Sequence, residues 1–472
     1  MIQSISILQV LGRIRFENPW WISGKIDRYF KEMPRRAYFS GFTTLAAERS
    51  VNRAIVLMGP RRVGKTVMLY HWVDELLSQG VDPRRILFIT VENPIYNRIG
   101  LEELFARGRQ AAGAEDELQG WHVIFDEIQY LKDWDVHLKS LVDSYRGNRF
   151  IVSGSAAAAL QYKSKESGAG RFTDFMLPPL TFFEFITMQG LQSLVKPGTI
   201  PWKNKEMPFF ATADIKVFNR HFLDYINFGG YPEALFSESV RTNPERFIRQ
   251  DVVDKVLLRD LPGLYGISDV QELNALFTTI AWNSGQECSL EALSQRSGAP
   301  KNTIKKYLDY LQAAYLVRIV RRIGQSGKRF QRDNFFKLHL TNPSLRSALF
   351  SPLDPTDEAM GAMTETAIVS QWMHRTRFTP WYARWKNGEV DMVGLDEKAL
   401  KPTWALEIKW SDRYFSRPHE LKSLLRFCSD NQLTEAIVTT ISVQESVEHD
   451  GMVLHFVPAA VYAYAVGANT LS

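Results

Sequence analysis

The chain has 472 residues, of which 45% are hydrophobic and 23% charged, so it can bury full cores and is too long for one compact domain. Its two cysteines, Cys288 and Cys428, exclude a disulfide framework, and no Cys/His spacing indicates a zinc site. The net charge of +5 is a mild basic excess, compatible with nucleic-acid binding but equally common in proteins that never touch DNA.

The N-terminal sequence predicts neither a secretion signal nor a membrane anchor. The first residues, MIQSISILQVLGRIRF, lack a basic region, and their apolar stretch is interrupted by polar residues. No window holds the roughly 18 consecutive apolar residues that a membrane span needs. We therefore expect a cytoplasmic protein without a membrane partner.

The first large feature is an α/β pattern from Arg53 to about Leu180. Apolar segments that read as buried strands alternate with helical patterns; the segments are AIVLMG, RILFITV, HVIFDEI and RFIVSGS. Continuous apolar strands separated by amphipathic helices are typical of a parallel sheet with helices on both faces. This pattern predicts an open α/β domain.

A phosphate-binding loop follows the first of these strands. Residues 59–66 match GxxxxGK[ST] between a strand and the helix TVMLYHWVDELL, which is the context the motif requires and which disfavours a chance match. Glycines let backbone N–H groups surround phosphates at a helix N-terminus, so ATP with Mg²⁺ is the expected ligand. Lys65 would reach the β- and γ-phosphates, and Thr66 would hold Mg²⁺. The predicted nucleotide-binding residues are Gly59, Pro60, Arg61, Arg62, Val63, Gly64, Lys65, Thr66, Val67, Asp126 and Ser153.

Polar residues at the ends of later segments complete the predicted ATPase site. Asp126 ends an apolar strand, where it would bind the Mg²⁺ shell, and Glu127 would orient the attacking water. Ser153 could sense the γ-phosphate or could be a turn residue. Arg171 could be an arginine finger, in its own subunit or a neighbouring one, or a structural arginine. The predicted catalytic residues here are Lys65, Glu127 and Arg171.

With these motifs in place, the chain resembles a prokaryotic group of AAA+-type P-loop ATPases with a C-terminal restriction-endonuclease-like domain. The resemblance spans nearly the whole chain and is carried by residues 18–21 (NPWW), 59–66, 125–130 (FDEIQY), Trp134, 153–155 (SGS), 166–171 (ESGAGR), 179–185 (PLTFFEF) and 229–233 (GGYPE). It implies an AAA+-type core. In such ATPases a tryptophan of the NPWW segment could stack on adenine; the alternative, which we favour, is that both tryptophans pin an N-terminal arm onto the core.

A helix–turn–helix is predicted after a helical stretch from about Asp214 to Ile280. Residues 289–311 read as helix, glycine turn and helix, and the strand-like segment 315–323 resembles the strand of a winged module. The predicted nucleic-acid contacts at the start of the second helix are Lys301, Asn302, Lys305 and Lys306. The basic stretch 318–332 could follow phosphates. The alternative is a lid or protein-contact module with solvated lysines.

The last third of the chain carries a possible metal site. Asp391 lies in one strand-like segment, and Glu407 and Lys409 share one face of the next because residues i and i+2 of a strand point the same way. Two carboxylates can bind Mg²⁺ or Mn²⁺, and a lysine can position a water. Glu365, Asp391 and Glu407 are the predicted metal ligands, beside Thr66 and Asp126 at the P-loop, and Lys409 is a predicted catalytic residue. The order of these residues is similar to that of the restriction-endonuclease-like superfamily; the alternative is a catalytically silent domain.

Together these patterns predict an α/β fold in four parts. They are a P-loop ATPase core with an N-terminal arm (1–212), a helical lid (213–280), a winged helix-turn-helix (281–350) and a restriction-endonuclease-like domain (351–472). The leading hypothesis is an ATP-hydrolysing protein that acts on DNA with a metal-dependent nuclease domain. The alternative is an ATP-controlled switch that binds DNA or a protein without cleaving. An arginine finger from a neighbouring subunit would require a homo-oligomer.

Overall fold

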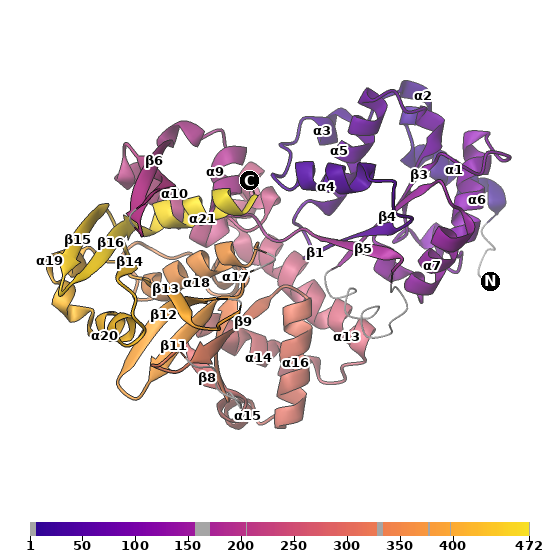
Figure 1. The fold of residues 1–472 in the computed structure, drawn as a ribbon. Helices are drawn as coiled ribbons and strands as arrows, with labels where there is room; N and C mark the ends of the chain where they lie inside the picture. Colours follow the sequence, from indigo (N-terminus) through magenta and orange to yellow (C-terminus); the bar gives the residue numbers. More distant parts are fainter. Residues whose placement is uncertain are drawn as a thin grey trace. The chain divides into compact units, whose positions relative to one another are not determined.

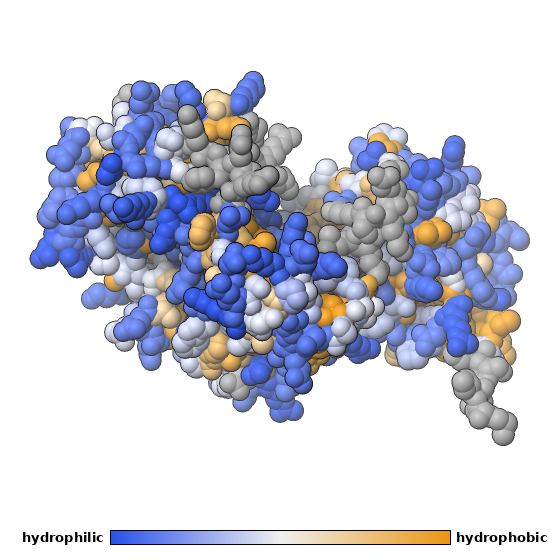
Figure 2. Space-filling view, turned by 90° about the horizontal axis from the view of Figure 1, so that it is seen from below, coloured by the Kyte–Doolittle hydropathy of each residue, from blue (hydrophilic) through white to orange (hydrophobic). Residues whose placement is uncertain are grey.

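The computed structural model describes residues 6–155, 170–203, 205–327, 334–375, 378–396 and 398–471. The chain divides into two compact units, Met1–Pro178 and Pro179–Ser472, and each is described by itself (Figure 1). Within the described residues, none of the helices combines the length and the apolar character that a membrane span requires. Hydrophilic side chains cover most of the face drawn in Figure 2, and apolar ones form only small groups there.

The N-terminal unit is built on a parallel five-stranded sheet with the order β2-β3-β4-β1-β5. The strands are β1 (Ala54–Gly59), β2 (Ile86–Thr90), β3 (His122–Asp126), β4 (Arg149–Ser155) and β5 (Phe172–Met176). Each neighbouring pair is parallel, and β1 to β4 are buried along nearly their whole length. This burial explains the continuous apolar runs in the sequence. The predicted parallel α/β sheet is therefore confirmed.

In the part of the chain that the structure describes, four helices of this unit precede β1, and three others connect consecutive strands from β1 to β4. They are α1 (Ile7–Glu17), α2 (Trp20–Ser23), α3 (Arg28–Lys31), α4 (Phe39–Ala47), α5 (Lys65–Ser78), α6 (Leu101–Ala112) and α7 (Trp134–Ser144), with 3₁₀ turns at Pro83–Arg85, Pro94–Tyr96 and Ile128–Tyr130. Residues of α1, α6 and α7 share one buried core with β1 to β4.

The N-terminal arm is attached to the edge strand β2. The side-chain amide of Asn18 donates to the carbonyl of Phe88 (2.8 Å) and accepts from the Phe88 amide (2.7 Å), so it pairs with β2 as a further strand would. Trp20 and Trp21 both donate their indole N–H to the carbonyl of Ile86. Trp20 is fully buried and therefore has no face open to a base. The NPWW segment protects a sheet edge, as the structural alternative predicts.

The C-terminal unit contains a nine-stranded mixed sheet with the order β15-β16-β14-β13-β12-β11-β9-β10-β8. The strands are β8 (Glu287–Ser289), β9 (Val317–Ile323), β10 (Phe335–Leu340), β11 (Trp381–Trp385), β12 (Gly388–Leu395), β13 (Pro402–Glu407), β14 (Glu435–Thr440), β15 (Glu445–His449) and β16 (Met452–Pro458). A separate hairpin is formed by β6 (Val195–Trp202) and β7 (Lys205–Thr212). Strand β9 pairs parallel with β11, so the strands of segment 281–350 and those of segment 351–472 belong to one sheet.

The helices of this unit include a long π-helical stretch. They are α9 (Phe182–Met188), α10 (Ile215–Phe228), α11 (Pro232–Phe236), α12 (Glu238–Thr242), the π-helices Glu245–Asp254 and Val256–Asp260, α13 (Leu261–Tyr265), α14 (Val270–Trp282), α15 (Leu290–Ser297), α16 (Lys301–Ala313), α17 (Ser344–Leu349), α18 (Met360–Trp372), α19 (Arg413–Ser416), α20 (Lys422–Asp430) and α21 (Ala459–Leu471), with 3₁₀ turns at Gln192–Leu194 and Pro418–Glu420.

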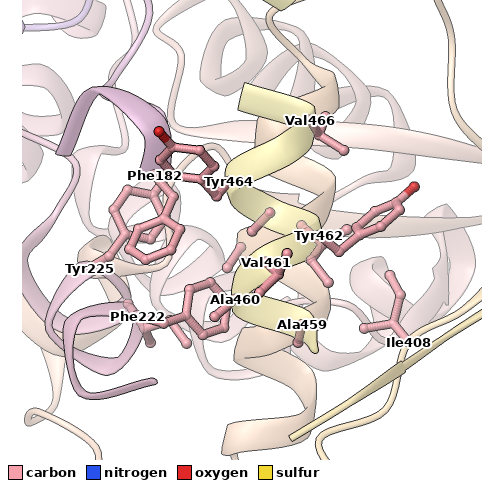
Figure 3. Packing of buried hydrophobic residues seen from close by; sticks show 14 of the residues in the cluster. Phe182, Phe222, Tyr225, Ile408, Ala459, Ala460, Val461, Tyr462, Tyr464 and Val466 are labelled. Carbon is pink, nitrogen blue, oxygen red and sulfur yellow. The ribbon is translucent and has the colours of Figure 1, made fainter. Parts of the chain in front are cut away.

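Two helical layers bury the sheet of the C-terminal unit. The C-terminal helix α21 is buried over residues 459–467 and packs against Phe182, Phe222 and Tyr225 of α9 and α10 (Figure 3). Its small side chains allow this close approach, and α18 belongs to the same core. Helix α20 packs in a second core with β12, β13 and β14. Helix α18 carries Glu365, one of the predicted metal ligands.

Candidate functional site

The P-loop joins β1 to α5, as its motif predicts. Gly64 has a φ of 93°, a left-handed value that favours glycine, and a side chain on Gly59 would collide with the carbonyl of Leu177. Lys65 opens α5 and is 6% exposed; its ammonium group donates to the carbonyls of Gly59 (3.1 Å) and Pro60 (2.9 Å). The loop therefore curls around the lysine that the motif assigns to phosphate.

Three predicted site residues meet behind this loop. The hydroxyl of Thr66 donates to one carboxylate oxygen of Asp126 (2.8 Å), and the hydroxyl of Ser153 donates to the other. Asp126 is 2% exposed, and burial, aided by the charge of Glu127, raises its pKa to about 6. The parallel order β3-β4-β1 causes this meeting because it brings the carboxyl ends of these strands to one edge.

Glu127 is held by a residue that sequence analysis missed. Its backbone has a φ of 57°, and the side-chain amide of Gln129 donates to its carboxylate. The oxygen of the same amide accepts from the backbone N–H of Ser155 (3.2 Å). Gln129 therefore ties the end of β3 to the end of β4. Gln129 belongs to the FDEIQY segment that carries the family resemblance, but the sequence alone indicated no role for its side chain.

Arg36 is a second residue that sequence analysis missed, and it connects the P-loop to the segment after β5. It is 5% exposed, and its guanidinium donates to the carbonyls of Val63 (2.6 Å) and Pro178 (3.0 Å). A buried arginine far upstream of the motif carries no sequence signal for this contact. Of the other loop residues, Val63 is buried, and the guanidinium of Arg61 donates to the hydroxyl of Tyr130 (3.2 Å).

Arg171 is not brought to the P-loop of its own chain. It precedes β5 at the amino end of the sheet, where its carbonyl accepts from the Ala54 amide (2.9 Å), whereas the P-loop follows the carboxyl end of β1. Its guanidinium forms an ion pair with Asp143 (2.8 Å) at the end of α7. Residues 166–169 of the same motif lie outside the described residues. Within its own chain, Arg171 therefore lies before the amino end of β5, paired with Asp143.

Comparisons with known proteins agree with the P-loop site. A family model described as an AAA domain matches residues 51–186, and one described as a domain of unknown function (DUF8612) matches residues 219–357. The N-terminal unit therefore contains an AAA-type P-loop ATPase domain. The second match spans the boundary between the predicted lid and the predicted winged helix-turn-helix.

The curated relatives have no assigned function. The chain is 24% identical over 284 residues to an uncharacterised Haemophilus influenzae protein, a match that covers 59% of this chain and 65% of that protein. It is 24% identical to the uncharacterised protein MJ1544 of Methanocaldococcus jannaschii, with 72% of each chain covered. Another uncharacterised protein of that organism, MJ1637, is 21% identical over 73% of each chain.

Similar solved structures have low TM-scores. The Aeropyrum pernix Orc1 protein in complex with DNA has a TM-score of 0.32 at 12% identity, covering 70% of this chain and 95% of that one. The replication initiator DnaA, bound to AMPPCP and single-stranded DNA, has a TM-score of 0.27 at 14% identity, covering 60% and 88%. Scores of this size establish no shared fold for the whole chain.

Two helices joined by a short turn lie in the C-terminal unit over the residues for which the sequence predicts a helix–turn–helix. Helix α15 ends at Ser297, the following Gly298 has a φ of 77° that permits the turn, and α16 begins at Lys301. One face of α16 is buried through Ile304, Tyr307, Leu308 and Leu311. On the opposite face, the predicted contact residues Lys301, Asn302, Lys305 and Lys306 are exposed. Of the basic stretch 318–332, residues 328–332 lie outside the described residues.

The structure brings Asp391, Glu407 and Lys409 together. Strands β12 and β13 pair so that Met392 faces Leu406, which makes Asp391 and Glu407 the next opposite pair. The ammonium group of Lys409 lies 2.8 Å from Glu407 and 3.4 Å from Asp391. The backbone N–H of Ile408 also donates to Asp391 (2.9 Å). The predicted arrangement of two acids and a lysine on one sheet face is therefore present.

Glu365 joins this cluster through Lys337, a residue that sequence analysis missed. Lys337 lies on β10, and its ammonium group is 2.8 Å from Glu365, 2.6 Å from Glu389 and 3.6 Å from Asp391. Its side chain is 3% exposed. We refer to Lys337, Glu365, Glu389, Asp391, Glu407 and Lys409 as the carboxylate–lysine cluster. All members of the cluster but Glu407 line a pocket of about 560 Å³.

Burial and opposite charge compete in the carboxylate–lysine cluster. Burial raises the pKa values of Glu365 and Glu407, and nearby Asp391 raises both further. Burial also raises the pKa of Asp391, but Lys409 and Lys337 outweigh it, so the net shift is downward. The carboxylates in turn hold the pKa values of both lysines above the usual value, against the effect of burial. Both lysines therefore stay charged.

The cluster does not present a ready set of metal ligands. Across the described residues, no three Asp, Glu, His or Cys side chains converge in a way that could hold a metal ion. Both oxygens of Asp391 face a lysine, and Glu365 faces Lys337. One carboxylate oxygen of Glu407 is buried without a hydrogen-bond partner among the described residues. Most carboxylate oxygens of the cluster are therefore already engaged, and the free ones are fewer than the ligands that Mg²⁺ or Mn²⁺ takes.

Proposed function

We propose that this protein binds and hydrolyses ATP at the P-loop and uses the nucleotide to control binding of DNA by its helix–turn–helix. The meeting of Thr66, Asp126 and Ser153 behind the P-loop carries the proposal, because an ATPase needs a hydroxyl and a carboxylate at this position. The AAA-domain match over residues 51–186 supports it.

Each residue of the site has a role in this proposal. Backbone N–H groups of residues 61–67 would surround the phosphates, and Lys65 would exchange its loop carbonyls for phosphate oxygens. Thr66 and Asp126 would hold Mg²⁺, which would neutralise charge on the phosphates when bound. Glu127, fixed by Gln129, would polarise the attacking water, and Ser153 would sense the γ-phosphate through its contact with Asp126.

DNA is proposed as the partner because of the two faces of α16. The first two turns present Lys301, Asn302, Lys305 and Lys306 to solvent, while the opposite face is buried in the unit. A recognition helix contacts a groove with the residues at its N-terminal end, and lysines there pair with phosphates. Lys301 is engaged with Glu291 (2.6 Å) and would exchange that exposed ion pair for a phosphate.

A salt-dependent binding assay tests the DNA role. Duplex DNA should bind the ATP-loaded wild type, and log affinity should fall linearly with log salt concentration. The double variant Lys305→Ala, Lys306→Ala should bind at least about tenfold more weakly with a shallower salt slope. Lys422→Ala, an exposed lysine on α20, is the matched control. Affinity that is unchanged from low to high salt would point instead to a signalling ATPase with no nucleic-acid partner.

Metal-dependent cleavage of DNA by the C-terminal unit is the second candidate. The observation in its favour is the shared face of Asp391, Glu407 and Lys409, with one unpartnered oxygen on Glu407. The engaged carboxylates described above weigh against it. Incubation of linear and branched DNA with ATP and Mg²⁺ or Mn²⁺, with Lys409→Ala as control, decides the question. Lys409-dependent cleavage would replace the binding role with a nuclease; intact DNA supports a switch that binds without cutting.

A further inference from the structure

Lys337 occupies the centre of the carboxylate–lysine cluster. Its ammonium group faces Glu365 from α18 and Glu389 and Asp391 from β12, at 2.6 to 3.6 Å. The ring of Tyr382 on β11 lies 5.4 Å from the same nitrogen. His339, on the same strand, lies 3.7 Å from Glu365. A lysine that is 3% exposed is stable only when carboxylates surround it in this way.

The contacts of Lys337 are those that a divalent cation would otherwise make. Oxygen-rich sites hold Mg²⁺ or Mn²⁺ because several carboxylates converge on one point of positive charge. Here the ammonium group of Lys337 already occupies the point where the carboxylates converge. The ammonium group of Lys409 occupies the neighbouring position between Asp391 and Glu407. Arg384 adds a third positive charge at Glu389. Four carboxylates therefore face three fixed cations, which leaves little net charge to attract an ion.

We infer that Lys337 is the resident cation of the cluster and that the wild-type C-terminal unit takes no divalent metal there. Strand β10, which carries Lys337, pairs with β8 and β9 of the helix–turn–helix segment. Lys337 faces Glu287 of β8 in this pairing. The cation is thus supplied by the segment that also forms α16, and it joins that segment to β12 and α18. This property is independent of the proposed roles of ATP and DNA.

Titration with Mn²⁺ alone, followed by the loss of its free electron paramagnetic resonance signal, tests the inference on the full chain without nucleotide. The wild type should show no Mn²⁺ binding that disappears in the Asp391→Asn variant. Lys337→Met keeps most of the length of the side chain and removes its charge. It should gain one Mn²⁺ site, at least about tenfold tighter than any site of the wild type and lost again in the double variant Lys337→Met, Asp391→Asn.

Two further variants serve as a control and as a replacement in case Lys337→Met does not fold. Lys422→Met on α20 removes an exposed lysine and should behave as the wild type. If Lys337→Met does not fold by circular dichroism, Lys337→Gln, which keeps a donor to Glu365, takes its place. Asp391-dependent Mn²⁺ binding by the wild type overturns the inference. A folded Lys337 variant that gains no such site overturns it too, because Lys337 would then not be what excludes the metal.

Discussion

The hydroxyl of Thr66 donates a hydrogen bond to Asp126 across 2.8 Å, although sixty positions separate them in the chain. The contact connects the start of α5 to the end of β3, and it places a hydroxyl and a carboxylate side by side next to the P-loop. Ser153, at the end of β4, holds the second oxygen of Asp126. Three segments thus meet at one edge of the sheet.

Hydrolysis should depend on Glu127 more than nucleotide binding does. Glu127→Gln keeps the size of the side chain but removes the base, so ATP turnover should fall by about a hundredfold or more while ATP affinity stays within about twofold. Gln129→Leu should lower turnover by about tenfold, because it releases the Glu127 carboxylate. Single-turnover hydrolysis and nucleotide titration measure the two effects separately. Equal loss of binding and turnover in Glu127→Gln would contradict the assigned role.

Arg36 should stabilise the empty P-loop. Arg36→Met leaves the carbonyls of Val63 and Pro178 without their charged donor, so the free energy of unfolding should fall by about 2 kcal/mol and ATP affinity should weaken. The neighbouring Arg35 is a matched control, since its ion pairs with Asp74 and Glu75 are exposed. Arg35→Met should cost less than about 1 kcal/mol. Chemical denaturation and ATP titration of both variants measure the difference.

Arg171 should act between subunits if it acts in catalysis at all. Mixing Arg171→Ala with Lys65→Ala should restore ATP turnover that neither variant has alone, because each supplies the part that the other lacks. Asp143→Asn removes the partner of Arg171 and leaves the arginine in place. It should retain turnover. Mixtures that stay inactive, together with loss of stability in Arg171→Ala, would assign the residue a structural role only.

His122 should make the N-terminal unit lose stability in acid. Burial, and then the charges of Arg49 and Arg149, lower its pKa to about 4. Its Nε2 accepts from the Arg49 guanidinium (2.9 Å), which the protonated ring could not do. Because the unfolded chain takes up the proton first, stability is complete above about pH 6.5 and is lost as the pH falls towards 4. Protonation of His122 alone should lower the free energy of unfolding by about 2 kcal/mol between pH 7 and pH 5.

The His122→Gln variant isolates this contribution, since glutamine offers Arg49 an acceptor that does not titrate. Urea unfolding of both proteins at pH 7 and pH 5 gives the two differences in stability. The loss should be about 2 kcal/mol smaller in the variant. A wild type that loses no more than the variant would show that His122 is already protonated in the folded state.

The sequence predicted the N-terminal fold well because its signals are local. Apolar runs that end in charged or glycine residues indicated β1 to β4, and the motif 59–66 indicated the loop between β1 and α5. Strand β5 was not anticipated, since FTDFM has two polar residues, Thr173 and Asp174, within its five and is only partly buried. Strand β5 forms because it pairs with the free side of β1. The local sequence of β5 does not indicate this pairing.

By itself, the sequence predicted the residues of both candidate sites: Lys65, Thr66, Asp126 and Glu127 in one unit, and Asp391, Glu407 and Lys409 in the other. Motifs are short and their spacing is fixed by strand and helix geometry, so they can be read without a fold. Only the tertiary structure decided what surrounds them. It carried Arg36 to the P-loop, Arg171 away from it, and Lys337 into the acidic cluster. Such contacts join residues distant in the chain, and they depend on strand order and burial, which no local pattern encodes.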